Sequence, residues 1–389
     1  MASQQPKKFA AIMTVLLGGR ASHGRAILGR YFLGYNFNGQ PPWPRSYVAS
    51  MFTHQTPDDD ISREWGRRYG VPVFRTVHEA LTLGGEDLAV DGVLLIGEHG
   101  DYPLNDKGQK LYPRFELFLE ITDTFRRAGR AVPVFNDKHL SYSWIKAKRM
   151  YDISRELDFP MMAGSSVPVS YREPDWDLPR GTPLSKAAAV AYGGREAYAY
   201  HMIEGMQSVV ERRKGGESGL AWTQCLEGDA VWNYLDRTRW ARTLFDAALS
   251  RARRREPGEP RQLVKEPLAY LFGYRDGLEA ATFLMNGLLR DFTVAVQPAA
   301  APDPLSVLLR LEYKQPVRHF ACLVQMVDPM FQTGAPLYPV ERTLLVSGML
   351  DFAMESRIRG HQRIETPQLD VSYQAPRESH YCKGRPPWD

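Results

Sequence analysis

The sequence predicts an α/β fold with an N-terminal Rossmann-like, doubly wound parallel sheet. It also predicts a C-terminal α/β domain built on an open, mostly antiparallel sheet. Two observations support the first part. Apolar runs such as 90–96 and 131–135 alternate with helical segments along the first 165 residues, as in βαβ units. The runs are apolar throughout rather than at every second residue, which is typical of strands buried on both faces of a parallel sheet.

The elements of the first part follow in regular order. Strands are expected at 9–17, 47–52, 71–74, 90–96, 131–135 and 159–164. Helices are expected from residue 25 onward and at 61–69, 78–83, 112–129 and 143–157. The acidic run Asp58-Asp59-Asp60 is expected to supply the N-cap of the 61–69 helix, and Gly70 its C-cap.

The pattern changes after residue 165, where four prolines punctuate an irregular connection. Strand-like pieces follow at 187–192, 220–226, 269–273, 292–296 and 306–311, with a helix at 198–212 and another at 340–359. We therefore divide the chain into a first domain at 1–165, a second at 166–335, and a closing helix with an extended tail at 336–389.

The composition excludes several classes of protein. Of 389 residues, 49 are basic and 45 acidic, and a net charge of +4 is too small to favour nucleic acid as a partner. The three cysteines are far apart and form no CxxC pair, which favours a reducing compartment over a structural zinc site. No apolar stretch approaches the roughly 20 residues of a membrane span. We expect a cytoplasmic protein that does not enter a membrane.

Ionisable residues follow two of the predicted strands directly. The 90–96 strand leads into Glu98, His99, Asp101 and Tyr102, and the 131–135 strand leads into Asp137, Lys138 and His139. Ligands of an open parallel sheet bind at the carboxyl ends of its strands, so we expect these groups to face a substrate. Solvated loop charges and a salt-bridged helix start are the structural alternatives.

The same groups could serve two kinds of chemistry. Lys138 could stabilise an alkoxide or an enolate, with desolvation tuning its pKa. A histidine close to two carboxylates also suits a divalent metal. The candidate metal ligands are Glu98, His99, Asp101, Asp137 and His139.

Several segments, in this order, resemble the Gfo/Idh/MocA oxidoreductase family over nearly the whole chain. Tyr69-Gly70-Val71-Pro72 is similar to that family's "YGIP" segment, and 90–97 to its "VDAVxIxTP" strand. Val134-Phe135-Asn136-Asp137-Lys138-His139-Leu140 lies where the family has "VxxEKPL", and 338–360 resembles its closing helix.

The resemblance implies an NAD- or NADP-dependent oxidoreductase acting on a hydroxyl or keto group of a carbohydrate or polyol-like small molecule. Its first domain would bind the nucleotide and its second would bind substrate and form a homo-oligomer through the open sheet. The implied cofactor positions are Gly18, Gly19, Ser22, His23, Gly24 and His54. By position, the catalytic lysine is Lys138, and His201 is a second acid or base. His139, Asp137, Glu98 and His99 are further catalytic candidates, and Asp101, Tyr102 and Glu204 are candidate substrate contacts.

The chain also departs from the family pattern. The first turn has no GxGxxG, Thr53-His54 stands where an acidic residue would hold the ribose, and His139 replaces the signature proline. Two other hypotheses therefore stay open. One is a metal-assisted lyase, epimerase or hydrolase that uses Glu98, His99, Asp101, Asp137 and His139. The other is a non-catalytic, ligand-sensing subunit.

Overall fold

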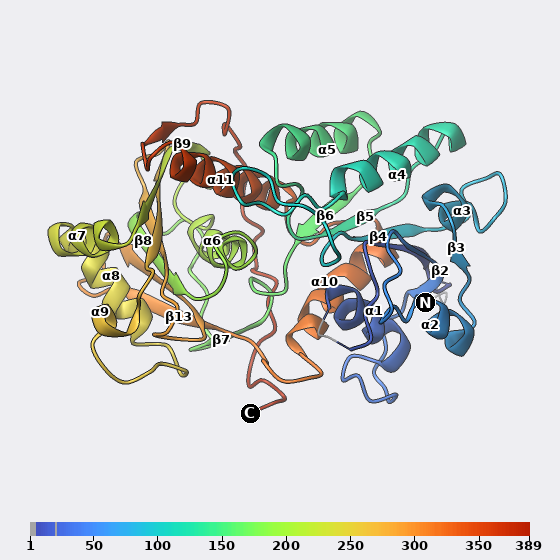
Figure 1. Cartoon of the computed structure of the whole chain (residues 1–389), viewed down its shortest axis with the longest axis horizontal. Coiled ribbons are helices and arrows are strands. Elements are labelled where there is room, and N and C mark those ends of the chain that lie inside the picture. Colours follow the sequence, from blue (N-terminus) through green and yellow to red (C-terminus); the bar gives the residue numbers. More distant parts are fainter. Residues whose placement is uncertain (1–4, 20–21) are drawn as a thin grey trace.

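A computed structural model describes residues 5–19 and 22–389 and contains the predicted parallel sheet (Figure 1). Its strand order is β3-β2-β1-β4-β5-β6, and neighbouring strands pair in parallel. The strands are β1 (Lys8–Met13), β2 (Tyr47–Thr53), β3 (Val73–Phe74), β4 (Gly92–Ile96), β5 (Val134–Asp137) and β6 (Met161–Gly164). The order reverses between β1 and β4, so the crevice that binds ligands in such sheets opens at their carboxyl ends.

Helices cover both faces of this sheet. Ala10 and Ile12 of β1 face one apolar cluster, whereas Phe9 and Ala11 face the other. The helices on the first face are α3 (Val77–Thr82), α4 (Arg114–Ala128) and α5 (Trp144–Glu156). Those on the second are α1 (His23–Leu33), α2 (Ser62–Tyr69) and α10 (His319–Thr333). This two-sided burial explains why the strands read as continuous apolar runs.

The first strand is shorter than the 9–17 segment that the sequence predicts. After Met13 the chain turns, and residues 16–18 run beside the segment that leads into α2. Ile61 donates its N–H to the Leu16 carbonyl at 2.9 Å, and Gly18 donates to the Asp59 carbonyl at 2.9 Å. The predicted aspartate cap misses by one residue: the N-cap position is Ile61, while Asp60 just before it accepts the Ser62 N–H at 3.2 Å.

The second sheet has eight strands in the order β14-β9-β10-β11-β8-β12-β13-β7. Its pairs are antiparallel except for β8 with β11. The strands are β7 (Tyr171–Glu173), β8 (Leu184–Ala191), β9 (Leu220–Glu227), β10 (Leu268–Tyr274), β11 (Glu279–Leu284), β12 (Phe292–Pro298), β13 (Leu305–Arg310) and β14 (Ile364–Glu365). The mostly antiparallel sheet predicted for this part is confirmed.

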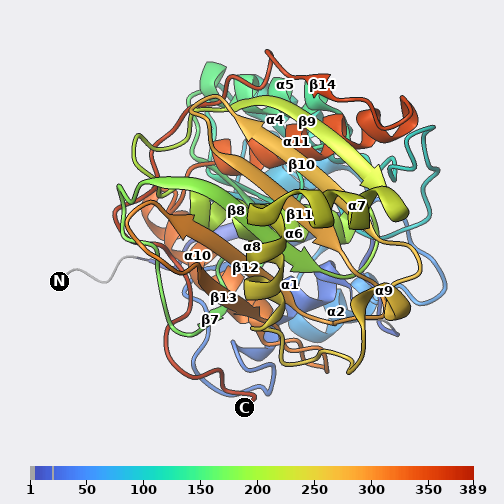
Figure 2. The ribbon, with the colours of Figure 1, turned by 90° about the vertical axis from the view of Figure 1, so that its left-hand side faces the viewer.

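Helices also cover both faces of the second sheet. On the inner face lie α6 (Ala197–Val210) and α11 (Glu341–Ile358). On the outer face, α8 (Arg239–Leu249) packs across β8 and β12 and α7 (Asp229–Arg237) packs on β9, with the short α9 (Pro260–Leu263) nearby (Figure 2). The second sheet is open, because it does not close into a barrel. Its outer face, through which we expected another copy of the chain to bind, is covered by α7 and α8.

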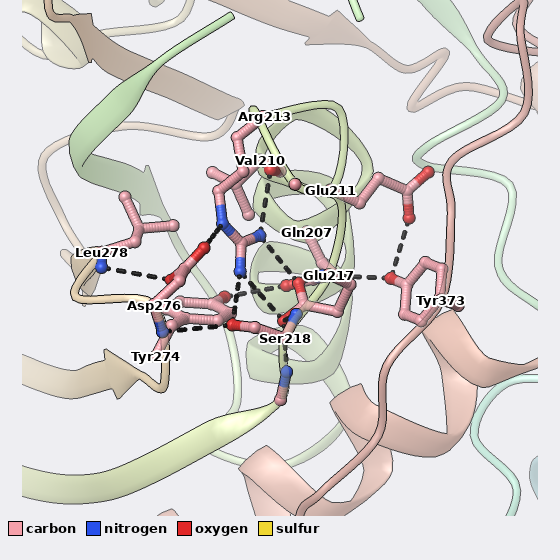
Figure 3. Close-up of polar contacts among 12 residues, drawn as sticks. Gln207, Val210, Glu211, Arg213, Glu217, Ser218, Tyr274, Asp276, Leu278 and Tyr373 are labelled. Atoms are coloured by element: carbon pink, nitrogen blue, oxygen red, sulfur yellow. Dashed lines mark hydrogen bonds and ion pairs between the residues drawn. The ribbon is translucent and has the colours of Figure 1, made fainter. Parts of the chain in front are cut away.

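A buried polar network fixes the carboxyl end of α6 (Figure 3). Arg213 donates to Glu217 at 2.9 Å and to Asp276, in the turn between β10 and β11, at 2.6 Å. Gln207 donates to Glu217 at 2.5 Å and to the Tyr373 hydroxyl at 3.0 Å. The network ties α6, which carries His201, to the sheet and to the C-terminal tail.

The composition led to expectations about the cysteines and about membrane spans, and the structure bears on both. The cysteines are free and buried. Among the described residues, no helix combines the length and the apolar character needed to cross a bilayer.

Candidate active site

A cavity of about 250 Å³ lies between the carboxyl ends of β4 and β5 and the second sheet. Its polar lining consists of Ser22, His23, Glu98, His99, Lys138, Ser166, His201 and His319. Its aromatic lining consists of Tyr192, Tyr198, Phe292, Tyr313 and Phe320. A larger hollow of about 950 Å³ runs along α2 and β3 and includes Thr53 at the end of β2, but it contains none of the ionisable residues that follow β4 and β5. We therefore place the site in the smaller cavity, where titratable groups converge.

Lys138 is held in this cavity by a buried ion-pair chain. Its Nζ lies 3.1 Å from Glu98 Oε1, and Arg114 Nη2 lies 2.5 Å from Glu98 Oε2. Burial alone would raise the pKa of Glu98, but the charges of Lys138 and Arg114 outweigh it and hold that pKa well below its usual value. Gly97 leaves the space for this chain, because a Cβ there would collide with the Arg114 side chain. Glu98 is thus an anion that fixes Lys138 as a cation.

A second polar pair links α1 to β5. His23 Nδ1 lies 2.6 Å from Asp137 Oδ2, and the Asp137 side chain is fully buried. Asp137 follows Phe135 by two residues and therefore points to the same face of the sheet, where α1 packs. The other carboxylate oxygen, Asp137 Oδ1, has no partner among the described residues.

Three of the cavity histidines have lowered pKa values and are neutral near pH 7. Burial lowers the pKa of His99 to about 4, and the neighbouring His23 adds to the effect. Burial, with Lys138 and His23 next, lowers the pKa of His201 well below its usual value. Burial, with Arg30 next, lowers the pKa of His319 to about 3. Within the described ranges His99 Nε2 and His201 Nδ1 lack a protein partner, so they are free to bond a polar ligand.

The structure brings together only part of the predicted site. Lys138, His201, Glu98, His99, Ser22 and His23 line the cavity, and Asp137 lies directly behind His23. His139 is turned away, with its Nε2 3.7 Å from Glu196 and its ring beside Tyr200. Glu204 does not line the cavity, since its carboxylate accepts from the N–H of Ser165 at 3.1 Å and from its hydroxyl.

Sequence reasoning missed several cavity residues, and His319 is the clearest example. It opens α10, a helix that packs on the first sheet although it lies more than 150 residues away from it in the sequence. No local motif marks His319, Tyr313 or Phe292 as site residues. They are brought to the cavity by long-range packing alone.

The first turn of α1 has the properties of a phosphate site. A Cβ on Gly24 would lie 2.9 Å from the Val15 carbonyl, so α1 lies as close to the chain as the last glycine of a dinucleotide fingerprint allows. The first-turn N–H groups of a helix have no partners within it and attract anions. Gly18 has a packing role, because its Cβ position is occupied by Ile61, whereas a Cβ on Gly19 would lie 3.8 Å from Asp59 Oδ2.

The rim where the adenosine ribose of a dinucleotide would bind is closed by direct contacts. Gln55 Nε2 donates to the Asp101 carbonyl at 2.8 Å, and its Oε1 accepts from the Asp101 N–H at 2.9 Å. His54 Nδ1 lies 2.8 Å from the Tyr102 hydroxyl. His54, Asp101 and Tyr102 therefore link the loops after β2 and β4 and do not line the cavity. The residues present fit a phosphate at α1, and this link lies where the resemblance expects the adenosine ribose.

The metal hypothesis gains no support from the geometry. Over residues 5–19 and 22–389, no three histidine, cysteine, aspartate or glutamate side chains converge as a metal site requires. The candidates are instead engaged elsewhere: Glu98 by Lys138 and Arg114, Asp137 by His23, and His139 near Glu196.

Comparisons with known proteins identify the fold. No family model and no curated protein sequence matches this chain. GenD2 from gentamicin A biosynthesis, solved in complex with NAD, is 12% identical with a TM-score of 0.59, and the match covers 94% of this chain and 97% of that one. The apo scyllo-inositol dehydrogenase from Lactobacillus casei is 9% identical with a TM-score of 0.54, covering 93% and 98%.

A third solved structure extends the comparison. Biliverdin reductase from Synechocystis sp. PCC 6803, in complex with biliverdin and NADP+, is 11% identical with a TM-score of 0.50, covering 90% of this chain and 99% of that one. At such identities the likeness establishes the fold alone. It confirms the fold that the resemblance to the Gfo/Idh/MocA family predicts.

Proposed function

We propose that this protein is an NAD(P)-dependent oxidoreductase that acts on a hydroxyl or keto group of a polyol or carbohydrate-like small molecule. The observation that carries the proposal is Lys138, a buried cation held by Glu98 beside a cavity at the carboxyl ends of β4 and β5. Solved structures with this fold include an inositol dehydrogenase and proteins in complex with NAD or NADP+, which favours the same chemistry here.

Each group of cavity residues has its own role in the proposed reaction. Lys138 stabilises the negative charge on the substrate oxygen, because a fixed cation in a water-poor site acts strongly on developing charge. The neutral His99 and His201 bond other substrate hydroxyls through their unpartnered nitrogens. Ser22 and the first turn of α1 hold a phosphate of the cofactor. When bound, the nicotinamide supplies the hydride acceptor or donor. The free cysteines favour a reducing compartment, and we propose the cytoplasm.

Cofactor turnover tests this proposal. NAD+ or NADP+ is mixed with the protein and with inositols and sugar alcohols, one at a time, and reduction is followed by absorbance. We expect turnover with at least one polyol. Lys138→Met should lower kcat about 10²- to 10³-fold, as loss of an oxyanion-stabilising group does. Lys148→Met, which removes an exposed lysine paired with Asp152, should leave it unchanged.

Two outcomes would contradict the proposal. Full activity of Lys138→Met would show that Lys138 takes no part in the reaction. Tight binding of a polyol without any cofactor reduction, by wild type and variant alike, would favour the ligand-sensing alternative.

A further inference from the structure

We propose that His23, held by Asp137, is the catalytic residue that takes the proton from the substrate hydroxyl and returns it in the reverse direction. This inference rests on the proposed function and assigns its acid–base group. His23 is the first residue of α1 and lines the cavity. The resemblance implied only a cofactor contact for it.

The contact with Asp137 fixes the chemistry of the ring. A carboxylate only accepts hydrogen bonds, so at 2.6 Å it is His23 Nδ1 that donates to Asp137 Oδ2. The proton of the neutral imidazole is therefore on Nδ1, and Nε2 keeps its lone pair. Asp137 orients the ring and stabilises the imidazolium that forms. Asp137 is a positioning residue, since His23 lies between it and the cavity.

The competing groups are less suited to accept a proton. Lys138 is held as a cation by Glu98, 3.1 Å away, so it has no free lone pair. Among the described residues, the unbonded Nδ1 of His201 has no carboxylate to support it, and burial keeps its ring neutral. His319 Nδ1 already accepts the N–H of Glu312 at 3.2 Å.

Charged and titratable groups face His23 from every side of the cavity. Glu98 and His99 follow β4, Asp137 and Lys138 end β5, His201 lies on α6, and His319 opens α10. Two of these groups are carboxylates and one is a buried lysine. Of these groups, the Asp137 carboxylate is the one in direct hydrogen-bond contact with the His23 ring, at 2.6 Å.

The proton and electron balance follows from this geometry. In oxidation, the O–H bond of the substrate breaks and its proton goes to His23 Nε2. The O–H electron pair would become the second C–O bond, and a bound nicotinamide would supply the acceptor for the hydride that leaves that carbon. Lys138 holds the oxygen while its charge develops. The His23 side chain is 15% exposed, so its proton is released to water after turnover.

Substitution with chemical rescue tests the role of His23. We expect His23→Ala to lower kcat about 10²- to 10⁴-fold with KM within a few fold, and added imidazole to restore part of the rate. His23→Gln should be equally slow but not rescued. Asp137→Asn should also be slow. His78→Ala, on α3 and bonded to Thr124, is the matched control and should behave as wild type. Thermal unfolding confirms that each variant is folded.

A readout without turnover checks the dyad itself. In ¹⁵N-labelled protein, His23 should be the Nδ1-protonated tautomer, and Asp137→Asn should abolish that preference. His23→Ala at wild-type kcat, or an Nε2-protonated His23 in wild type, would overturn the inference. Wild-type protein that reduces no cofactor would instead overturn the proposed function, and the proton-acceptor role with it. Turnover that does not depend on His23 would overturn the inference alone.

Discussion

At the residue scale, the site is a set of buried ionisable groups that pair instead of becoming neutral. Isolated charges are costly to bury, yet Glu98, Arg114 and Lys138 are each at most 5% exposed. Each is within ion-pair distance of another, which offsets the desolvation. At one end of this ion-pair chain, the charged side chain of Lys138 faces the cavity, where it can act on a ligand.

Glu204 gives a prediction about pH. Burial raises its pKa to about 7, although hydrogen bonds from Ser165 and the charge of Arg342 oppose the shift. The folded state thus binds this proton more tightly than the unfolded state, and stability falls as pH rises from about 4.5 to about 7. At about 1.4 kcal/mol per pH unit, the wild type should lose up to about 3 kcal/mol relative to Glu204→Gln across that range.

Denaturant unfolding of both proteins at pH 5 and pH 8 measures this difference. Parallel pH dependence of the two unfolding free energies would show that Glu204 does not titrate in that range.

The strand-end residues of the site could be predicted from sequence, whereas their partners could not. Glu98, His99, Asp137 and Lys138 follow recognisable buried strands, and the geometry of a parallel sheet brings such ends together. The bond between His23 and Asp137 joins residues 114 positions apart, and no local pattern specifies it. His139 was predicted as catalytic because it belongs to the ionisable run after the 131–135 strand, but β5 ends at Asp137 and the His139 ring lies beside Tyr200.

At the element scale, the link between the loops after β2 and β4 controls access to the adenosine side of the crevice. Gln55→Ala removes two hydrogen bonds to Asp101, each with a net value of about 0.5–1.5 kcal/mol. If the adenosine has to break this link, the variant should bind NADH or NADPH about 5- to 150-fold more tightly. Nicotinamide mononucleotide, which has no adenosine, should bind equally to both proteins.

Calorimetric titration with the three ligands measures these affinities. Weaker dinucleotide binding by Gln55→Ala would mean that Gln55 contacts the cofactor instead of obstructing it.

The network at the end of α6 gives a prediction about stability. Glu217→Gln leaves Arg213, whose side chain is 1% exposed, with a weakened partner. Breaking a buried ion pair on one side costs about 3–5 kcal/mol, so unfolding in urea should begin at a clearly lower concentration. Glu365→Gln, which breaks an exposed pair with Arg363, is the control and should change little. A loss for Glu217→Gln below 1 kcal/mol would contradict this account.

The strands and helices of the first 165 residues were largely predictable because each βα unit is local in sequence. The helix α10 was not predicted, since its residues are buried on nearly all sides and show no amphipathic stripe. The helices α7 and α8 were also missed, and with them the cover on the second sheet. Whether a sheet face is covered depends on tertiary packing, which the pattern of the strands does not reveal.

At the scale of the whole molecule, the outer face of the second sheet is buried in a hydrophobic core under α7 and α8 and is not exposed to solvent. Trp232, Leu244 and Phe245 of α7 and α8 pack against Ala188 and Phe283 of the sheet. The homo-oligomer implied by the family resemblance would use that face, and it stays untested. We expect a particle of one chain, 44.2 kDa, by light scattering after gel filtration. A stable dimer at micromolar concentration would require another interface.

The central claim is that this fold, without a glycine fingerprint, binds a nicotinamide dinucleotide beside Lys138. The most direct measurement is calorimetric titration of the purified protein with NADH and with NADPH. We predict one site per chain for at least one of them, with binding weakened by Gly24→Val, whose side chain would push α1 away from Val15. No heat from either dinucleotide at millimolar concentration, with polyol binding retained, would contradict the account.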